Sequence, residues 1–245
     1  VANNGTVDLS LKPERAVQYE IGTTGSYLEN RLSTQLDVFD VENTNKLVSE
    51  TSSSVTFTTN AGKQRNRGVE ASIGYAVLRD TTRMVSLVRP WLSYSFTDAK
   101  FMDFKSDNNN GPNTVSFSGN AVPRVPRNTI GAGLDVGTQQ GFFLNGTFLH
   151  IDRVPVTFDN STYVRGYNLL GAKVGYRRAV ARHWMLELFG GGDNLLGSTN
   201  YSFLFVGPNI RGLASSAQGG TGDGYIIPAA YDATGYGSVS LRYVF

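Results

Sequence analysis

The C-terminal stretch Gly235-Tyr-Gly-Ser-Val-Ser-Leu-Arg-Tyr-Val-Phe245 alternates between two kinds of side chain. Val239, Leu241, Tyr243 and Phe245 fall on one face of an extended strand, and mostly polar residues fall on the other. An unprotected amphipathic edge strand invites pairing with other chains, so such an ending is unusual for a soluble protein. A strand that closes a barrel and faces lipid has this pattern, so the stretch predicts a transmembrane β-barrel.

Composition agrees with this class. The chain has 245 residues, and its 17% of charged residues lies below the quarter that is usual in soluble domains. It has no run of about 18 apolar residues, which argues against a transmembrane helix. The mean hydropathy of -0.21 does not separate the two classes, because only alternate residues of a barrel strand meet lipid. A net charge of +2 without a basic stripe argues against nucleic acid, and the lack of cysteine excludes thiolate sites.

Period-2 alternation recurs along the chain and predicts about nine strands. They cover roughly residues 17–27, 32–38, 68–77, 84–97, 127–136, 142–151, 170–177, 184–191 and 235–245. A disturbed pattern at Arg89-Pro90 predicts a β-bulge there, because proline cannot donate to the ladder. The facing of Trp91 and of the sixth strand is left open, because both parities fit.

The connections between these strands alternate in length. Turns of about 3–5 residues alternate with connections of about 14–40, and residues 42–67 are expected to form a loop with ragged strand extensions. Bacterial outer-membrane barrels show this asymmetry, with tight periplasmic turns and long outer loops. Aromatic residues gather beside the short turns and predict a girdle at one membrane interface: Tyr27, Tyr75, Phe142, Tyr176, Trp184 and Phe245.

A soluble all-β sandwich or barrel is the alternative fold. A soluble core packs its large residues inside, whereas here the large residues share a face with the terminal aromatic residue. The opposite face is rich in glycine and carries charges of both signs, namely Glu20, Asp37, Glu70, Lys173, Arg177, Glu187 and Arg242. The pattern therefore favours the membrane barrel.

The strand count is odd. With short turns inside and long loops outside, the first predicted strand runs inward and the last one also ends inside. Bacterial single-chain barrels have even strand numbers. We therefore expect an odd number of strands to precede Val1, so that residues 1–245 would be the C-terminal portion of a larger barrel.

Five motifs in order resemble the TonB-dependent outer-membrane receptors. They are Leu11-Lys-Pro-Glu14 with Tyr19-Glu20-Ile21-Gly22, Asn60-Ala-Gly-Lys63 with Arg67-Gly-Val-Glu70, Val125-Pro-Arg127, Asp193-Asn-Leu-Leu196 with Asn200-Tyr201, and Tyr236 to Phe245. Gly197 stands where the family usually has Asp. The resemblance implies an all-β antiparallel barrel of 22 strands with a plugged lumen. This chain would supply the last nine strands, and the N-terminal plug and the other strands would be absent from it.

The resemblance also implies a function. The expected activity is active import of a scarce nutrient across the bacterial outer membrane, with a ferric siderophore leading and cobalamin, haem or an oligosaccharide open. A passive pore is the alternative class. The implied partners are outer-membrane lipid, the plug and remaining strands, TonB through the absent plug, and the barrel-assembly machinery, which would read Leu241, Tyr243 and Phe245. A ferric chelate would be the transported ligand, and no cofactor is expected.

No catalytic or metal-binding motif is present, so an enzyme is not expected. His150 and His183 lack a Ser/Asp constellation and are expected to be interfacial or lumen-facing polar residues. The mixed lumen charge suits hydrogen bonding to a plug better than a selective open pore. Ligand capture is expected in the outer loops, where aromatic and Arg side chains suit a large anionic chelate. The candidates are Arg153, Tyr163, Arg165, Tyr167, Tyr201, Phe203 and Phe205, and an ordinary loop role is the competing interpretation for each.

Overall fold

The computed structural model describes residues 11–52, 55–107, 114–204, 226–228 and 233–243. The main sheet contains β1 (Arg15–Tyr27), β2 (Leu32–Ser52), β3 (Val55–Tyr75), β4 (Leu78–Arg79), β5 (Val85–Asp103), β8 (Asn128–Thr138), β9 (Phe142–Ile151), β12 (Tyr167–Ala181), β13 (Trp184–Asp193) and β16 (Thr234–Tyr243). Three short hairpins lie outside it, formed by β6 (Lys105–Asp107) with β7 (Thr114–Ser116), β10 (Val154–Pro155) with β11 (Tyr163–Val164), and β14 (Tyr201–Leu204) with β15 (Ile226–Pro228).

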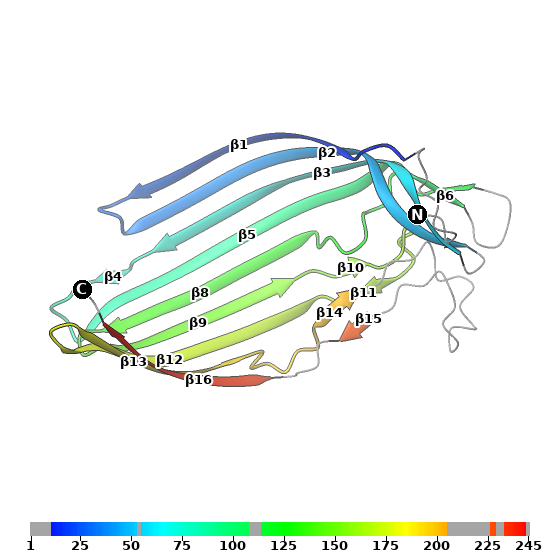
Figure 1. Ribbon diagram of the computed structural model, residues 1–245. Coiled ribbons are helices and arrows are strands. Elements are labelled where there is room, and N and C mark those ends of the chain that lie inside the picture. Colours follow the sequence, from blue (N-terminus) through cyan, green and yellow to red (C-terminus); the bar gives the residue numbers. More distant parts are fainter. Residues whose placement is uncertain (1–10, 53–54, 108–113, 205–225, 229–232, 244–245) are drawn as a thin grey trace.

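The main sheet is antiparallel throughout, and its order follows the chain as β1-β2-β3-β5-β8-β9-β12-β13-β16, with β4 beside β5 (Figure 1). Each principal strand therefore pairs with its neighbours in sequence, as hairpin connections require. The short turns gather at one end of the sheet, and the long connections with their hairpins gather at the other (Figure 1). The prediction of nine principal strands is confirmed, and the connections alternate in length as predicted except between β2 and β3, which only residues 53–54 separate. Among the described residues no helix has the length and apolar character needed to cross a membrane.

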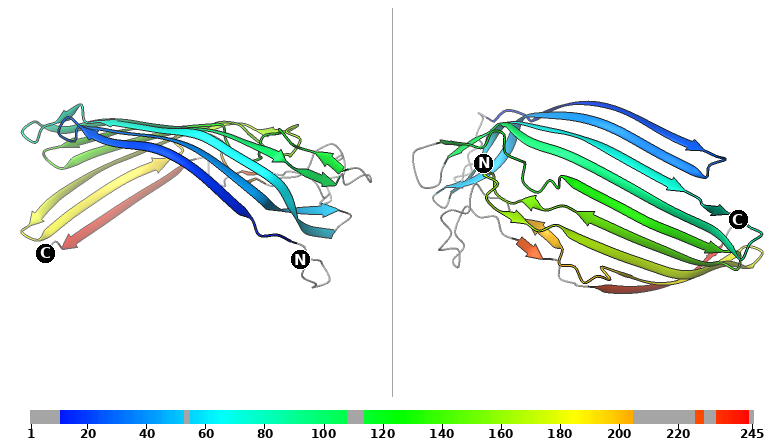
Figure 2. Two further views of the ribbon diagram at one scale, coloured as in Figure 1. Left: turned by 90° about the horizontal axis from the view of Figure 1, so that it is seen from above. Right: turned by 180° about the vertical axis from the view of Figure 1, so that it is seen from behind.

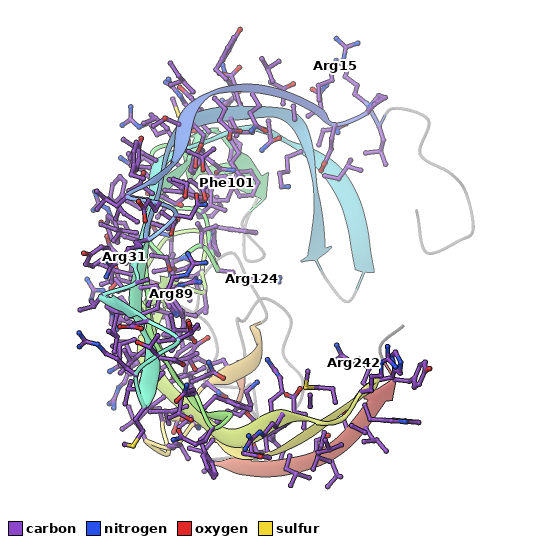
Figure 3. All side chains as sticks on the ribbon, turned by 90° about the vertical axis from the view of Figure 1, so that its left-hand side faces the viewer. Arg15, Arg31, Arg89, Phe101, Arg124 and Arg242 are labelled. Carbon is purple, nitrogen blue, oxygen red and sulfur yellow. The ribbon has the colours of Figure 1, made fainter. Side chains whose placement is uncertain are left out.

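The sheet bends into an open arc (Figures 2 and 3). In the described part of the chain, β1 pairs only with β2 and β16 pairs only with β13. The two edges of the arc are thus left without a partner, as the odd strand count predicts. An arc of this curvature is the shape of a barrel segment.

Side chains of alternate parity lie on the two faces of the arc. In Figure 3, Arg15 of β1 points to the convex side and Arg242 of β16 points to the concave side. Large apolar residues share the convex face and are strongly exposed, with Ile21 at 76% and Val239 at 77%. The concave face carries most of the charged residues and many of the glycines, so the predicted division of the strands into an apolar face and a small, charged face is confirmed.

The predicted aromatic girdle lies on the convex face at the short-turn end. Phe142 packs against Tyr176 with ring centroids 5.0 Å apart, and Trp184 packs against Tyr243 at 5.2 Å. Tyr27 and Tyr75 flank Leu32 in the register of β1, β2 and β3. Phe245 lies outside the described residues.

The bulge predicted at Arg89-Pro90 is wrong. The register of β5 with β8 runs without interruption from Arg89 opposite Asp135 through Pro90 opposite Leu134, and it shifts instead between Val85 and Leu87. On its other side, the pairing of β5 with β3 ends at Trp91, and β5 pairs with β4 only at Leu87 and Val88. Pro90 therefore sits at a break in the neighbouring ladder, where its missing N–H group costs no hydrogen bond.

Two facings that the sequence left open are settled by the register. Trp91 lies on the concave face, where its ring covers Gly133 so closely that a Cβ atom there would overlap it. In β9, Phe142 lies on the convex face beside Tyr176, whereas Phe143 lies on the concave face under the side chain of Lys173. The glycine at position 133 is thus needed for the close approach of an aromatic ring.

The loop expected at residues 42–67 is instead a long strand hairpin. The pairing of β2 with β3 continues from Leu32 opposite Tyr75 to Ser52 opposite Val55. Asn45 and Gly62 have positive φ values of 55° and 35° and interrupt the ladder at one level. Beyond this level the Ser- and Thr-rich sequence shows no apolar alternation, because neither face of a hairpin outside the membrane meets lipid.

Candidate functional site

The long connections at one end of the sheet are tied together by an aromatic cluster. Phe101, Phe104, Phe117 and Phe158 are all buried, and their ring centroids lie 4.6 to 5.8 Å apart. Three of these residues belong to β5 and the β5–β8 connection, and Phe158 belongs to the β9–β12 connection. The described parts of the two connections therefore pack as one body, which we call the loop lobe (residues 104–107, 114–127 and 152–166). Phe101 points to the concave side of the arc (Figure 3).

Hydrogen bonds join the two halves of the loop lobe. The Asn120 amide donates to the Phe158 carbonyl at 2.8 Å, and the Asn160 amide donates to the Ala121 carbonyl at 2.9 Å. The backbone N–H of Arg124, which has a φ of 69°, donates to the Pro155 carbonyl at 3.0 Å. These bonds satisfy polar groups that the aromatic cluster removes from water, so they hold the lobe in one arrangement.

A third connection docks onto this lobe. Val154, Val156 and Val164 of the β10–β11 region form a small buried core, and Tyr201 of β14 packs against it. The Leu195 N–H donates to the Leu170 carbonyl, and the Asn194 side chain closes the following turn through Ser198. These contacts bring residues 198–201 beside the start of β12.

A pocket of about 580 Å³ lies at this junction. It brings together four of the seven predicted ligand residues, Tyr163, Arg165, Tyr167 and Tyr201. Asn168, Ser198 and Thr199 add polar groups to its wall. Two segments that are far apart in sequence, residues 163–168 and 198–201, thus converge on one concavity, which is the usual form of a small-molecule site.

Aromatic contacts fix the side chains of this pocket. The Tyr167 and Tyr201 rings meet edge to face, with centroids 6.0 Å apart. The Arg153 guanidinium lies over the Tyr163 ring at 4.8 Å, so a fifth predicted residue contacts a residue that lines the pocket. Arg165 is exposed, and no carboxylate of the described residues forms an ion pair with it. The pocket therefore combines aromatic faces with a cation that is available to an anionic ligand.

Tyr167 is the first residue of β12, at the loop end of the strand. Burial raises the pKa of its hydroxyl group, and the neighbouring Tyr201 adds to the rise. The phenol therefore stays protonated at physiological pH and can donate a hydrogen bond to an oxygen of a ligand.

For the remaining two predicted ligand residues, Phe203 and Phe205, only the backbone of Phe203 is described. The backbone of Phe203 belongs to β14, where it pairs with Ile227, and Phe205 lies outside the described residues. Asn168, Ser198 and Thr199 were not predicted, because small polar residues in loops carry no pattern that separates a pocket wall from a solvent-exposed turn. Among the described residues, no group of three or more His, Asp or Glu side chains could hold a metal ion.

The position of His150 fits the prediction that the histidines are interfacial or lumen-facing polar residues. Its ring contacts Asn168 at 2.7 Å and Asp152 at 3.4 Å on the convex face, at the loop-side boundary of the apolar residues. His183 lies in the short turn before β13, with its ring 5.5 Å from that of Tyr243. Both therefore lie near the two edges of the apolar band.

The concave face carries carboxylates on one wall of the arc. Asp37 of β2 lies directly opposite Glu70 of β3, and Glu20 lies on the adjoining strand β1. Among the described residues, the side chains that donate hydrogen bonds to them are neutral, with Gln18 at 2.6 Å from Glu20, Gln35 at 2.7 Å from Asp37 and Ser95 at 3.4 Å from Glu70. We call these three residues the acidic wall.

The opposite wall carries cations. Arg177 of β12 makes a two-point contact with Glu187 of β13 at 2.8 and 2.9 Å. Lys173 lies between the Phe143 and Phe189 rings at 5.6 and 5.1 Å, and Arg242 lies on the neighbouring strand. The two walls of the lumen face thus differ in charge sign.

Several solved structures share this fold. The siderophore receptor PiuA from Acinetobacter baumannii matches with a TM-score of 0.68 at 17% identity, over 98% of this chain and 30% of that chain. The ferric yersiniabactin uptake receptor FyuA from Yersinia pestis matches with a TM-score of 0.62 at 17% identity, over 95% and 30%. The copper transporter OprC matches with a TM-score of 0.63 at 16% identity, over 99% and 33%. The chain thus spans about a third of the length of these structures.

A family profile gives the assignment that these distant structural matches do not give alone. The profile described as TonB dependent receptor-like, beta-barrel matches residues 1–195, which is most of the chain. The match covers four of the five motifs in full or in part, and it agrees with the open antiparallel arc and the two faces. This family consists of receptors rather than enzymes, in agreement with the prediction. The chain belongs to the TonB-dependent receptor β-barrel family.

Proposed function

We propose that this chain is the C-terminal portion of an outer-membrane receptor that imports a scarce nutrient, with a ferric siderophore as the leading substrate class. The pocket formed by Tyr163, Arg165, Tyr167 and Tyr201 is the observation that carries this proposal. Aromatic faces, phenol hydroxyl groups and the Arg165 guanidinium, which no carboxylate in the described part of the chain pairs with, suit a large anionic chelate. The pocket lies among the long connections, which face the cell exterior in barrels of this kind.

The structural neighbours reduce the range of possible substrate classes only partly. PiuA and FyuA are described as receptors for siderophores, whereas OprC is described as a copper transporter. One barrel architecture therefore serves different ligands, and the loops must make the distinction. Cobalamin, haem and oligosaccharides remain alternative substrates of the same proposal.

The acidic wall supports a plug in the lumen. Like charges directly opposite each other destabilise a sheet, so Asp37 and Glu70 need a compensating partner. A plug domain that presents Arg or Lys side chains to β1, β2 and β3 would supply one. We place this plug and the remaining strands in a longer protein, and we propose that TonB acts through the plug.

The convex face supports the location in the outer membrane. Its exposed aliphatic side chains would contact lipid, and the aromatic girdle would lie at the periplasmic interface. Leu241 and Tyr243 lie on this face of the last strand, with 58% and 45% of their surface exposed. We propose that they act with Phe245 as the element that the barrel-assembly machinery reads.

Uptake by cells tests the proposal. Cells that lack the intact gene should lose import of one class of radiolabelled ferric chelate, and the complete gene should restore it. Arg165→Gln should raise the concentration needed for half-maximal uptake about tenfold, because a hydrogen bond to a charged group contributes about 1.5–3 kcal/mol. Tyr167→Phe keeps the ring and should have a smaller effect.

The matched control is Arg182→Gln, which removes an exposed cation from the short-turn end. It should leave uptake unchanged. Import that persists without TonB or without the proton gradient would indicate a passive pore. Import of cobalamin, haem or an oligosaccharide in place of ferric chelates would support the receptor function and overturn the proposed substrate class.

A further inference from the structure

The concave face of β12 carries the chemistry of the outer pocket a second time, closer to the short turns. Tyr167 stands at the loop end of this strand, and every second residue after it shares its face. Leu169 and Gly171 follow, and Lys173 and Arg177 come further along. At about 3.3 Å per residue, Lys173 lies roughly 20 Å and Arg177 roughly 33 Å from Tyr167 along the strand. One strand face therefore leads from the outer pocket to a pair of cations.

Aromatic rings flank both of these cations. The Lys173 ammonium lies 5.6 Å from the centre of the Phe143 ring and 5.1 Å from that of the Phe189 ring. The Arg177 guanidinium lies over the Phe143 ring at 5.3 Å. Tyr236 meets Phe189 edge to face, with ring centroids 6.2 Å apart. This wall of the lumen thus presents ring faces and cations side by side, as the outer pocket does.

Two glycines make room for these rings against the sheet. A Cβ atom at Gly175 would come within 2.5 Å of the Phe143 ring, and a Cβ atom at Gly191 would come within 2.7 Å of the Tyr236 ring. A side chain at either position would therefore displace a ring of the cluster. The ring faces are thus built into three paired strands, which position them more firmly than a loop would.

This part of the wall has an excess of positive charge. The Arg177 guanidinium is paired with the Glu187 carboxylate at 2.8 and 2.9 Å. The positive charges of Lys173 and Arg242 act on the same carboxylate. Asp193 lies further toward the loops, at the other end of β13. Three cations and one carboxylate leave a net charge of +2, and we call Lys173, Arg177, Glu187 and Arg242 the inner cation site.

The charge on the other wall acts in the same direction. The acidic wall belongs to β1, β2 and β3, and the inner cation site belongs to β12, β13 and β16, at the other end of the arc (Figure 3). An anion inside the lumen is repelled by the first and attracted by the second. An anion that leaves the outer pocket is therefore drawn along β12, the strand that joins the two sites.

We propose that the inner cation site is a second binding site for the imported anion, which it occupies after leaving the outer pocket and before its release. The ligand class is an anion that carries aromatic rings or carboxylates, as many metal chelates do. Lys173 and Arg242 offer charge to it, because no carboxylate in the described part of the chain forms an ion pair with either. The Phe143 and Phe189 rings offer their faces.

The inner cation site lies at the exit end of the lumen. Arg177 directly follows Tyr176, which belongs to the girdle beside the short turns. The direction of transport rests on the proposed function, whereas the site itself rests on the contacts of Lys173 and Arg177. The competing occupant is an acidic segment of the plug. The repeat of cation and ring chemistry on one strand favours the imported anion, because a plug carboxylate would need the cations alone.

Photolabelling of the complete receptor, purified in a mild detergent, tests the proposal with azidosalicylate, an aromatic anion. The label should attach to peptides of β9, β12 and β13, and excess salicylate should prevent it. Lys173→Gln with Arg242→Gln should reduce this labelling about tenfold, because both charges that draw the anion are lost. Arg177 is left in place, since its removal would leave Glu187 without its partner. Lys173→Arg keeps the charge beside the rings and should be labelled nearly as strongly as the parent.

The matched control is Arg178→Gln with Arg182→Gln, which removes two exposed cations from the other face of β12 and from the turn after it. This variant should be labelled like the parent. Heat-modifiable migration on gels shows that each variant is folded. Equal labelling of the parent and of the folded double variant would overturn the proposal. A parent receptor without label on β9, β12 and β13 would also overturn it, because the plug would then occupy the site.

Uptake kinetics separate the inner cation site from the outer pocket. In cells that import a radiolabelled ferric chelate through the receptor, Lys173→Gln with Arg242→Gln should lower the maximal import rate several-fold. The concentration for half-maximal uptake should stay at the parent value, whereas Arg165→Gln raises it. Parental values of both quantities in the double variant would overturn the role in transport. Failure of every ferric chelate to enter would count against the proposed function alone, because photolabelling needs no transport.

Discussion

Asp37 of β2 and Glu70 of β3 lie directly opposite each other on the concave face of the sheet. Directly opposed side chains of an antiparallel pair have Cβ atoms about 5 Å apart, so the two carboxylates repel each other. Gln35 and Ser95 donate hydrogen bonds to them but bring no compensating charge. The arc on its own is therefore strained by charge at this position, and a positively charged occupant of the lumen would relieve it.

Glu70→Gln should have opposite effects with and without a plug. In the complete receptor it should lower the free energy of plug unfolding by about 1.5–3 kcal/mol, because a charge-assisted hydrogen bond is lost. In a receptor that lacks the plug it should raise barrel stability by a few tenths of a kcal/mol, because repulsion from Asp37 is relieved. Denaturant titration of both forms measures the two effects.

The control for this prediction is Glu187→Gln. Glu187 already pairs with Arg177 inside the sheet, so its loss should destabilise the barrel in both forms. A change of the same sign for Glu70→Gln in both forms would show that no plug cation contacts the acidic wall.

The loop lobe should behave as one folded body. Phe104 is fully buried, and its ring lies 4.9 Å from that of Phe158 in the other connection. Phe104→Ala should destabilise the lobe by about 3–5 kcal/mol, which is the usual cost of removing a buried aromatic ring. Both connections should then become sensitive to a protease added outside intact cells, at sites in residues 104–127 and 152–166 alike.

Phe104→Leu is the conservative control for the lobe, since it keeps most of the buried apolar volume. It should leave both connections largely resistant to protease. Cleavage confined to the β5–β8 connection in Phe104→Ala would show that the two connections fold independently.

The turn before β5 should make stability depend on pH. The Thr82 hydroxyl group lies 2.6 Å from Asp80 and is the main cause of its lowered pKa, helped by the Thr82 N–H and the Arg83 guanidinium. A carboxyl group with a lowered pKa stabilises the fold above its ordinary pKa of 3.8, and the effect is lost as the pH falls through the lowered value.

Asp80→Asn therefore provides the test of this turn. Its Tm should lie below that of the parent at pH 7, and the difference should begin to close as the pH falls below 3.8 and be gone once the pH has passed the lowered pKa, where Asp80 of the folded parent becomes neutral. Thermal unfolding in detergent at a series of pH values measures the difference. A gap that stays constant down to acid pH would show that Asp80 acts through its shape and not its charge.

Much of the fold could be predicted because lipid and lumen impose alternation on each strand. Strands without this alternation could not be recognised. The part of the β2–β3 hairpin beyond Asn45 has no apolar face, so the sequence predicted a loop there. The bulge at Pro90 was misplaced for a different reason. The cost of a missing N–H group depends on whether the neighbouring strand offers an acceptor there, and the sequence of one strand does not contain this information.

The sequence could predict which types of residue form the candidate site, but it could not predict which of these residues come together in one pocket. Tyr163, Arg165 and Tyr167 stand close together in sequence, and their chemistry alone marks them as ligand candidates. Their contact with Tyr201 depends on the packing of Val154, Val156 and Val164, which have no recognisable pattern in a loop.

The last strand provides a test of assembly. Replacing Phe245 by Ser should lower the amount of receptor in the outer membrane several-fold while each inserted receptor keeps its ligand affinity. Leu241 and Tyr243 share the parity of Phe245 and are exposed on the convex face, where a partner protein can reach them before lipid does. Immunoblots of the outer-membrane fraction measure insertion, and ligand titration of the purified receptor measures affinity. Arg242→Gln on the concave face is the control, and it should insert normally. Normal membrane levels of Phe245→Ser would remove the assembly role and leave the strand only the task of closing the barrel.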